Sequence, residues 1–254
     1  MTLRVAVVGA RGRMGRQVCA AVTGAADLEL VAEVDPSSGD PASGRTAEEI
    51  AALAGAVDVA VDFTVPSVTE ANVHALIEAG IAPVVGTTGW TEDSLDRVRA
   101  ALDGTGLGAV IAPNFALSAV LAMRFAAMAA PYFESAEVIE LHHPNKVDAP
   151  SGTAMHTARG IASARARAGL DPMPDATETG FEARGMDVDG VRVHAVRQRG
   201  LVAHEEILFG NPGEQLTIRT DSFDRASFMP GVLLAVRAVA GRPGLTVGLD
   251  PLLG

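Results

Sequence analysis

The residue types best suited to acid–base chemistry gather in one short segment, residues 140–154. It holds His142 and His143, which are two of six histidines, together with Lys146, the only lysine, and Ser151-Gly152-Thr153 at the predicted start of a helix. The unpaired N–H groups at a helix start favour a carboxylate, and a histidine can donate a proton near neutral pH. This segment therefore predicts a site that binds an anion and transfers a proton.

Other interpretations of the same segment are open at this point. A strand end, a proline-rich loop and a serine helix cap would use the same residue types, with Lys146 in solvent. A metal site at His142 and His143 is disfavoured, because successive side chains of an extended segment point to opposite sides. No third ligand follows at a suitable spacing, so we expect no metal.

A second pattern with chemical meaning opens the chain. Three glycines, Gly9, Gly12 and Gly15, stand between a predicted strand and a predicted helix. Glycines there permit a tight turn and let a pyrophosphate approach the N-terminus of the helix. Asp35 lies about 20 residues further on, where a carboxylate can bind an adenosine ribose. The pattern predicts dinucleotide binding.

The sequence leaves the choice between NADH and NADPH open. Sites for NADP place an arginine near the ribose, whereas Pro36 follows Asp35 here and favours NAD. Arg11 and Arg13 lie within the glycine-rich turn, from which they can still reach a 2′-phosphate. Either cofactor fits the pattern.

Three further turns are expected at the same edge of the sheet, each directly after a predicted strand. They are Asp62-Phe63-Thr64, Gly86-Thr87-Thr88-Gly89 and Ala112-Pro113-Asn114-Phe115. Any one of them is also ordinary turn chemistry. Because parallel strands end at one edge of a sheet, the three together predict a bed for the nicotinamide end of the dinucleotide.

The elements that position these residues alternate between apolar strand patterns and helical patterns. Strands that are apolar throughout and separated by helices indicate a parallel sheet covered on both faces. The fold class is therefore α/β, with a Rossmann-like doubly wound sheet at residues 1–114 that residues from about 224 to 254 complete. The predicted strands are 3–8, 28–34, 57–63, 81–85 and 107–111, and the predicted helices are 13–23, 47–53, 68–79, 92–102 and 228–240.

Residues 115–223 are predicted to form a second domain of the α+β class with a mainly antiparallel sheet. Its predicted elements are a helix at 115–133, a strand at 136–142, a helix at 153–168, a long loop at 169–190 and strands at 191–197, 203–209 and 215–220. The turn Asn211-Pro212-Gly213 separates the last two strands. This spacing predicts an antiparallel meander.

Composition excludes several classes of function. The 254 residues carry a net charge of −11 with a pI near 4.9, which opposes non-specific binding to nucleic acid or anionic lipid. The longest apolar stretch, 116–132, contains Arg124 and Pro131 and is too short to span a bilayer. One cysteine and an N-terminus without a secretory pattern predict a cytoplasmic protein with no membrane partner.

The motifs resemble, in order, those of the 4-hydroxy-tetrahydrodipicolinate reductase family, and the likeness is greatest to its actinobacterial branch. The most specific match is Glu140-Leu141-His142-His143 followed by Lys146-Val147-Asp148-Ala149-Pro150-Ser151-Gly152-Thr153. The resemblance covers nearly the whole chain. It implies an oxidoreductase of lysine biosynthesis through diaminopimelate that reduces a cyclic imine dicarboxylate with NADH or NADPH and loss of water.

The resemblance also implies roles for particular residues. His142 would be the proton donor and Lys146 a second donor, while His143, Ser151, Gly152 and Thr153 would hold the substrate. Cofactor binding would involve Gly9, Ala10, Arg11, Gly12, Arg13, Met14, Asp35, Phe63, Gly86, Thr87, Thr88, Ala112, Pro113, Asn114 and Phe115. The second domain would bind substrate and assemble a homotetramer.

Two other classes of function share the first domain. One is a different dinucleotide-dependent oxidoreductase, and the other is a sensor that binds NAD(P)H and a partner protein without turnover.

Overall fold

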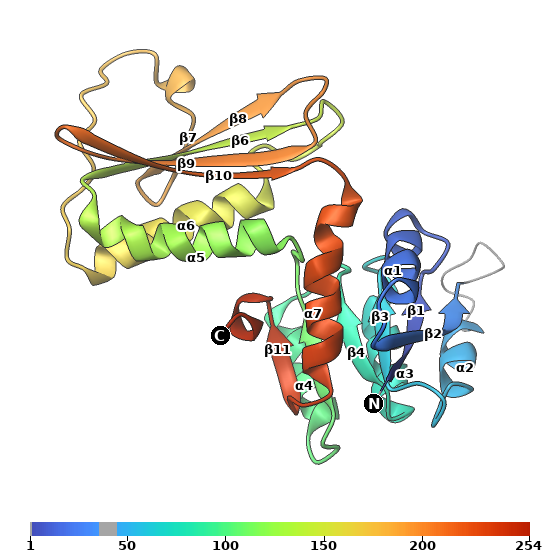
Figure 1. Ribbon diagram of the computed structural model, residues 1–254. Helices are drawn as coiled ribbons and strands as arrows, with labels where there is room; N and C mark the ends of the chain where they lie inside the picture. The colour runs from blue at the N-terminus through green and yellow to red at the C-terminus, as the bar shows by residue number, and fades with distance from the viewer. Residues whose placement is uncertain (1, 36–44) are drawn as a thin grey trace. The chain divides into compact units, whose positions relative to one another are not determined.

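The computed structural model describes residues 2–35 and 45–254 (Figure 1). The chain forms two compact units. The first combines Met1–Phe115 with Phe228–Gly254, and the second consists of Ala116–Ser227.

The first unit is built on a six-stranded sheet whose strands are all parallel. Their order across the sheet is β11-β5-β4-β3-β1-β2, so the direction of winding reverses between β1 and β3. Ligands of such sheets bind beyond the carboxyl ends of the strands at this reversal. The strands are β1 (Leu3–Val8), β2 (Leu28–Val34), β3 (Val59–Asp62), β4 (Ala82–Val85), β5 (Gly108–Ile111) and β11 (Gly244–Val247).

Helices cover both faces of this sheet (Figure 1). Every residue of β3, β4 and β5 is buried, as expected for strands without a solvent face. Helices α1 and α7 pack together on one face, and α2, α3 and α4 lie on the other. Their bounds are α1 (Arg13–Thr23), α2 (Arg45–Ala51), α3 (Thr69–Glu78), α4 (Glu92–Leu102) and α7 (Met229–Val239).

The doubly wound parallel sheet predicted from the sequence is confirmed, and the bounds of β1, β2, α1 and α4 are those predicted. Strand β11 was not predicted. Its four residues follow the turn that ends α7, and they pair with β5 across more than a hundred residues of sequence. A single short run of Leu245, Thr246 and Val247 carries no alternation that distinguishes a strand from a loop.

The second unit is a five-stranded mixed sheet with two helices on one face (Figure 1). Its strand order is β10-β9-β6-β8-β7. The strands are β6 (Ser135–His142), β7 (Met186–Val188), β8 (Val191–Arg197), β9 (Ala203–Asn211) and β10 (Glu214–Ser222). The helices are α5 (Leu117–Ala129) and α6 (Gly152–Arg167), and short 3-10 turns lie at Ala130–Tyr132 and Phe181–Arg184.

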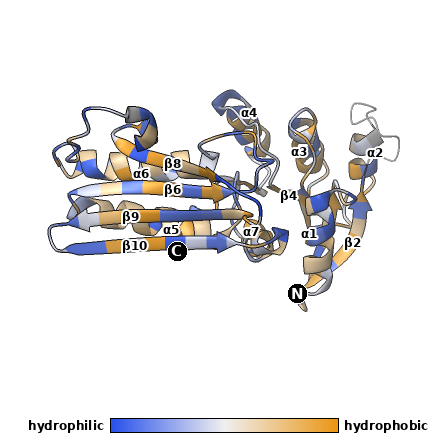
Figure 2. Ribbon diagram, turned by 90° about the horizontal axis from the view of Figure 1, so that it is seen from above, coloured by the Kyte–Doolittle hydropathy of each residue, from blue (hydrophilic) through white to orange (hydrophobic). Residues whose placement is uncertain are grey.

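Alternation along the strands separates the two faces of this sheet. In β6, Ala136, Val138 and Glu140 are buried toward α5 and α6, and the residues between them are half-buried. Figure 2 shows β8, β6, β9 and β10 side by side in front of α5 and α6. No helix among the described residues covers the front face of the sheet.

The predicted antiparallel meander is wrong. Strands β9 and β10 do form an antiparallel hairpin, but β6 lies between β8 and β9 and runs parallel to β8. Strand β7, together with a 3-10 turn, also interrupts the predicted loop at 169–190. Turn spacing shows only which strands follow one another in the sequence. Which strands pair across the sheet depends on how their apolar faces pack, and turn spacing does not show this.

Candidate active site

A cavity of about 600 Å³ lies at the carboxyl edge of the first unit's sheet. It is lined by the glycine-rich turn after β1, by the segment after β3 and by the turn after β4. Ten predicted cofactor residues line it, namely Gly9, Arg11, Gly12, Arg13, Met14, Asp35, Phe63, Gly86, Thr87 and Thr88. Ala10, Ala112, Pro113, Asn114 and Phe115 do not, and Pro36 lies outside the described residues.

The glycines of the first turn are required by its geometry. Gly9 has a φ of +82°, and a Cβ there would lie 2.8 Å from the carbonyl oxygen of Phe63. At Gly15, the Cβ would lie 2.1 Å from the carbonyl oxygen of Gly9. Asp35 accepts a 2.8 Å hydrogen bond from the backbone N–H of Arg11. The turn is therefore held close to α1, with a carboxylate beside it, as a dinucleotide requires.

Asp62, at the end of β3, organises the other wall of the cavity. Its fully buried carboxylate accepts bonds from the hydroxyls of Thr64 at 2.8 Å and Thr87 at 3.0 Å. It also accepts a 2.8 Å hydrogen bond from the side-chain amide of Asn72. One carboxylate thus ties the ends of β3 and β4 to the start of α3. The sequence signal for this residue was a charged group at the end of a wholly apolar strand.

The predicted substrate segment lies in the second unit, where β6 ends and α6 begins. Ser151 is buried and caps α6, because its hydroxyl accepts a 3.2 Å bond from the N–H of Ala154. Gly152 and His143 are exposed, and Thr153 is half-buried. The structure therefore brings the helix start and the predicted acid–base residues into one short stretch, with Ser151 facing the helix.

Glu140 connects the parts of this site. It has no exposed surface, and it accepts 2.7 Å bonds from both terminal nitrogens of Arg197. It also accepts a 2.9 Å hydrogen bond from the backbone N–H of Ser151, and its Oε2 lies 2.6 Å from Nδ1 of His142. Arg197 in turn donates to the carbonyl oxygen of Asp148 at 2.6 Å. Sequence reasoning missed this pair, which joins residues 57 apart.

Burial and neighbouring charges set the pKa values of Glu140 and His142. Burial opposes ionisation of Glu140, but the hydrogen bonds from Arg197 and His142 outweigh it and hold the pKa of the carboxyl below its usual value. Burial likewise lowers the pKa of His142, and the neighbouring Glu140 opposes this effect only in part. The ligand-free site therefore favours a neutral His142 that donates from Nδ1 to a charged Glu140.

Lys146 and Asp148 form the outer part of the site. The Lys146 ammonium lies 2.7 Å from the Asp148 carboxylate. This contact, together with a backbone bond from Gly152, holds the pKa of Asp148 below its usual value. An acidic group of the chain itself thus lies beside both the lysine and the helix start. A carboxylate of a ligand would use donors of the same two kinds.

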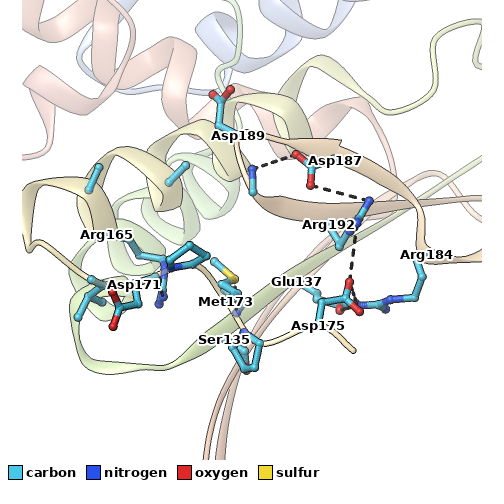
Figure 3. Close-up of a pocket in the computed structure, with 17 residues that line it drawn as sticks. Ser135, Glu137, Arg165, Asp171, Met173, Asp175, Arg184, Asp187, Asp189 and Arg192 are labelled. Atoms are coloured by element: carbon cyan, nitrogen blue, oxygen red, sulfur yellow. Dashed lines mark hydrogen bonds and ion pairs between the residues drawn. The ribbon is translucent and has the colours of Figure 1, made fainter. Parts of the chain in front are cut away.

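Figure 3 shows a cavity of about 470 Å³ in the second unit. It is lined by Ser135 at the start of β6 and by Arg165 near the end of α6, whereas the site above lies at the opposite end of both elements. Its arginines have partners within the protein. Arg184 pairs with Glu137 at 2.5 Å, Arg192 approaches Asp175 and Asp187 at 3.7 and 3.8 Å, and Arg165 donates to the carbonyl oxygens of Phe133 and Asp171. We assign no role in the chemistry to this cavity.

Glu205 of β9 is a second buried carboxyl beside Glu140. The two residues lie directly opposite each other in the antiparallel pair of β6 and β9. The Thr157 hydroxyl lies 2.8 Å from Glu205 Oε1 and 3.1 Å from the carbonyl oxygen of Thr153. Burial raises the pKa of Glu205, the hydrogen bond from Thr157 lowers it and the charge of Glu140 raises it, and together these effects place it at about 7. The sequence signal was a glutamate in the buried phase of a strand.

We expect Glu205→Gln to remove a pH-dependent loss of stability. Between pH 4.5 and 7 the unfolded chain ionises this carboxyl and the folded chain does not, so the folded state loses about 3 kcal/mol as the pH rises. Below pH 4.5 the carboxyl is protonated in both states. Urea unfolding is measured at pH 4.5 and 8, at one protein concentration. The free energy of unfolding should fall between these pH values by about 3 kcal/mol less in the variant than in the unmodified chain.

The control for that experiment is Glu206→Gln, which removes the adjacent carboxylate from the half-exposed face. It should unfold with the pH dependence of the unmodified chain. Equal pH dependence in all three proteins would contradict the assignment of a protonated Glu205.

No helix among residues 2–35 and 45–254 is long and apolar enough to cross a membrane. Within the same residues, no group of three or more His, Cys, Asp and Glu side chains is placed to hold a metal ion.

Comparison with known proteins places both units in one family. Residues 3–115 match the family described as "Dihydrodipicolinate reductase, N-terminus", and residues 118–253 match "Dihydrodipicolinate reductase, C-terminus". A protein of Beutenbergia cavernae named 4-hydroxy-tetrahydrodipicolinate reductase is 69% identical over 100% of this chain and 99% of its own. Its counterpart in Nocardia farcinica is 59% identical, with the same coverage.

A solved structure agrees with these matches. The dipicolinate-bound dihydrodipicolinate reductase of Paenisporosarcina sp. TG-14 is 38% identical, covers 100% of both chains and superposes with a TM-score of 0.88. The N-terminal and C-terminal matches together span nearly all of the chain, including the glycine-rich turn and the segment that carries Glu140, His142 and Lys146. This chain therefore belongs to the dihydrodipicolinate reductase family.

Proposed function

We propose that this chain reduces 4-hydroxy-tetrahydrodipicolinate to tetrahydrodipicolinate with NADH or NADPH, a step of lysine biosynthesis through diaminopimelate. The observation that carries this proposal is the cluster of Glu140, His142, Lys146 and the start of α6, built around one buried carboxylate. Family membership identifies the reaction, and the cluster has the groups that the reaction needs. The chain is an oxidoreductase, as its relatives are.

We assign the dinucleotide to the first unit. The cavity at the edge of its sheet has a glycine-rich turn that a Cβ would obstruct, and a carboxylate, Asp35, beside that turn. These residues fit a dinucleotide: the turn after β1 would hold its phosphates, and Gly86, Thr87 and Thr88 would hold its nicotinamide end. When bound, NADH or NADPH supplies the hydride. Arg11 and Arg13 line the same cavity, where they can contact the 2′-phosphate of NADPH, so the site fits either cofactor.

We assign the substrate to the second unit. The substrate is a dicarboxylate, and Lys146, His143 and the start of α6 supply positive charge and N–H donors for its carboxylates. The reaction removes the 4-hydroxyl as water, adds a hydride at C4 and adds a proton to the enamine that results. His142 donates that proton from Nε2, since Nδ1 faces Glu140.

Charge at His142 must therefore change when substrate binds. A bound dicarboxylate favours the imidazolium over the neutral ring, because opposite charges stabilise each other at short distance. Lys146 stabilises negative charge on the substrate and serves as a second proton donor. Ser151 holds the helix start in place through its cap, and Gly152 and Thr153 orient the substrate.

The test is oxidation of NADH and NADPH, measured in parallel by absorbance. The substrate is made in place from pyruvate and aspartate semialdehyde by a synthase, and omission of the synthase is the control. We expect rapid oxidation that depends on the synthase. Binding of the dinucleotide without oxidation would favour the sensor, and oxidation with a different substrate would favour another oxidoreductase.

We further propose that the chain acts as a cytoplasmic homotetramer that assembles through the sheet of the second unit. The helix-free face of that sheet presents half-buried Ile139, Leu141 and Leu208, together with paired charges. An apolar face of this kind favours burial against a second copy. Light scattering should give four times 26.1 kDa, and a monomer would contradict the proposal.

A further inference from the structure

Strand β6 carries two glutamates in similar surroundings on its opposite faces. Glu140 contacts His142 and Arg197, and Glu137 contacts His194 at 2.7 Å and Arg184. The two clusters differ in burial. The Glu140 side chain has no exposed surface, whereas the Glu137 side chain is 32% exposed.

The contacts of Glu140 reach every segment of the proposed substrate site. Its own strand carries His142, its bond from the Ser151 N–H fixes the start of α6, and Arg197 attaches it to β8. Through Arg197, the carbonyl of Asp148 is held as well, in the loop that carries Lys146. Both oxygens of Glu140 are fully used by its four bonds, one each with His142 and the Ser151 N–H and two with Arg197, so the carboxylate has one available orientation.

We propose that Glu140 is the positioning residue of the active site: held by Arg197, it fixes the His142 ring with Nε2 toward the substrate. The inference rests on the proposed function for the identity of the substrate. It adds a role that neither the motif nor the family match assigns to Glu140 or Arg197. Glu140 itself does not touch the substrate, because it is enclosed.

The arrangement also sets the protonation of His142. The charged groups that face the ring are Glu140 on β6, Lys146 in the following loop and Arg197 on β8. Only Glu140 favours the imidazolium, while the two cations oppose it. If Glu140 loses its charge, protonated His142 loses its one stabilising neighbour, and the imidazolium should form only at lower pH.

The experiment uses the full-length chain and the dicarboxylate dipicolinate, the ligand of the Paenisporosarcina relative. Its dissociation constant is measured by calorimetry from pH 5 to pH 9 for the unmodified chain, Glu140→Gln and Glu137→Gln. For Glu140→Gln, we expect the pH midpoint of binding to fall by at least one unit and kcat to fall at least tenfold. Glu137→Gln should retain both values, because it removes the same contact types from the other face.

A purely structural role for Glu140 predicts weaker binding by the same factor at every pH, and that result would overturn the proposal. So would an unshifted midpoint in Glu140→Gln. A far-ultraviolet circular dichroism spectrum equal to that of the unmodified chain shows that each variant is folded. If Glu140→Gln does not fold, the double variant Glu140→Gln with Arg197→Met removes both charges of the pair, and its midpoint should still fall.

The two proposals fail in different ways. If Glu140→Gln lowers the pH midpoint of dipicolinate binding but the unmodified chain does not oxidise NADH or NADPH, the proposed function fails and the role of Glu140 stands. If turnover is present and Glu140→Gln has the pH profile of the unmodified chain, the role of Glu140 fails alone.

Discussion

Replacing His142 by Asn should lower kcat by about 10²- to 10⁴-fold, the usual contribution of a positioned general acid. Asn can place an amide N–H near the position of Nδ1, so the bond to Glu140 is retained. It has no group at the position of Nε2 and cannot donate a proton from there. Dinucleotide binding should not change, because the cofactor cavity belongs to the first unit.

The pH dependence of the same variant gives a second measurement. Burial lowers the pKa of His142 in the free enzyme, so kcat/KM should fall above a midpoint lower than 6.5, about tenfold per pH unit. The fall in kcat should have its midpoint at a higher pH than the fall in kcat/KM, because the bound dicarboxylate favours the imidazolium. Both limbs should disappear in His142→Asn.

The control for His142 is His156→Asn, an exposed position on α6. It should retain wild-type kcat and both pH limbs. A His142→Asn protein with kcat within threefold of wild type would contradict the assignment of His142 as proton donor.

Lys146→Ala is expected to reduce kcat/KM by about 10²- to 10³-fold, because a charge-assisted contact and a proton donor are lost together. Lys146→Arg separates the two roles. Arginine keeps the positive charge but does not give up a proton near neutral pH, so KM should be largely retained while kcat falls. Steady-state kinetics with both variants measures each role.

The matched control is Arg167→Ala, which removes an exposed cation from the far end of α6. It should leave KM and kcat unchanged. Wild-type turnover in Lys146→Ala would show that the lysine is a solvated charge in the loop, the simpler interpretation of its sequence context.

The first unit could be predicted closely from the sequence because its signals are local. Apolar strands such as β1 and β2 end at recognisable turns, and α4 begins with the reciprocal cap of Thr91 and Ser94. The second unit was less predictable. The insertion of β6 between β8 and β9 depends on contacts far apart in the sequence, which no local pattern encodes.

The candidate site shows the same division. His142, His143, Lys146 and Thr153 lie in one continuous segment, so their residue types alone marked them as a site. Arg197 was missed because nothing near it in the sequence points to Glu140. Glu140 had a signal, since it follows Ala136 and Val138 on the buried phase of β6 and a charge there requires a partner.

The most direct test of the central claim is transfer of deuterium from dinucleotide that carries deuterium at both hydrogen positions of C4 of the nicotinamide. With the synthase-generated substrate, tetrahydrodipicolinate should gain one deuterium, located at C4 of the ring, and His142→Asn should lose most of this product. Deuterium at another carbon would contradict the proposed reaction. Product without deuterium, or oxidation of the dinucleotide without labelled product, would contradict it as well.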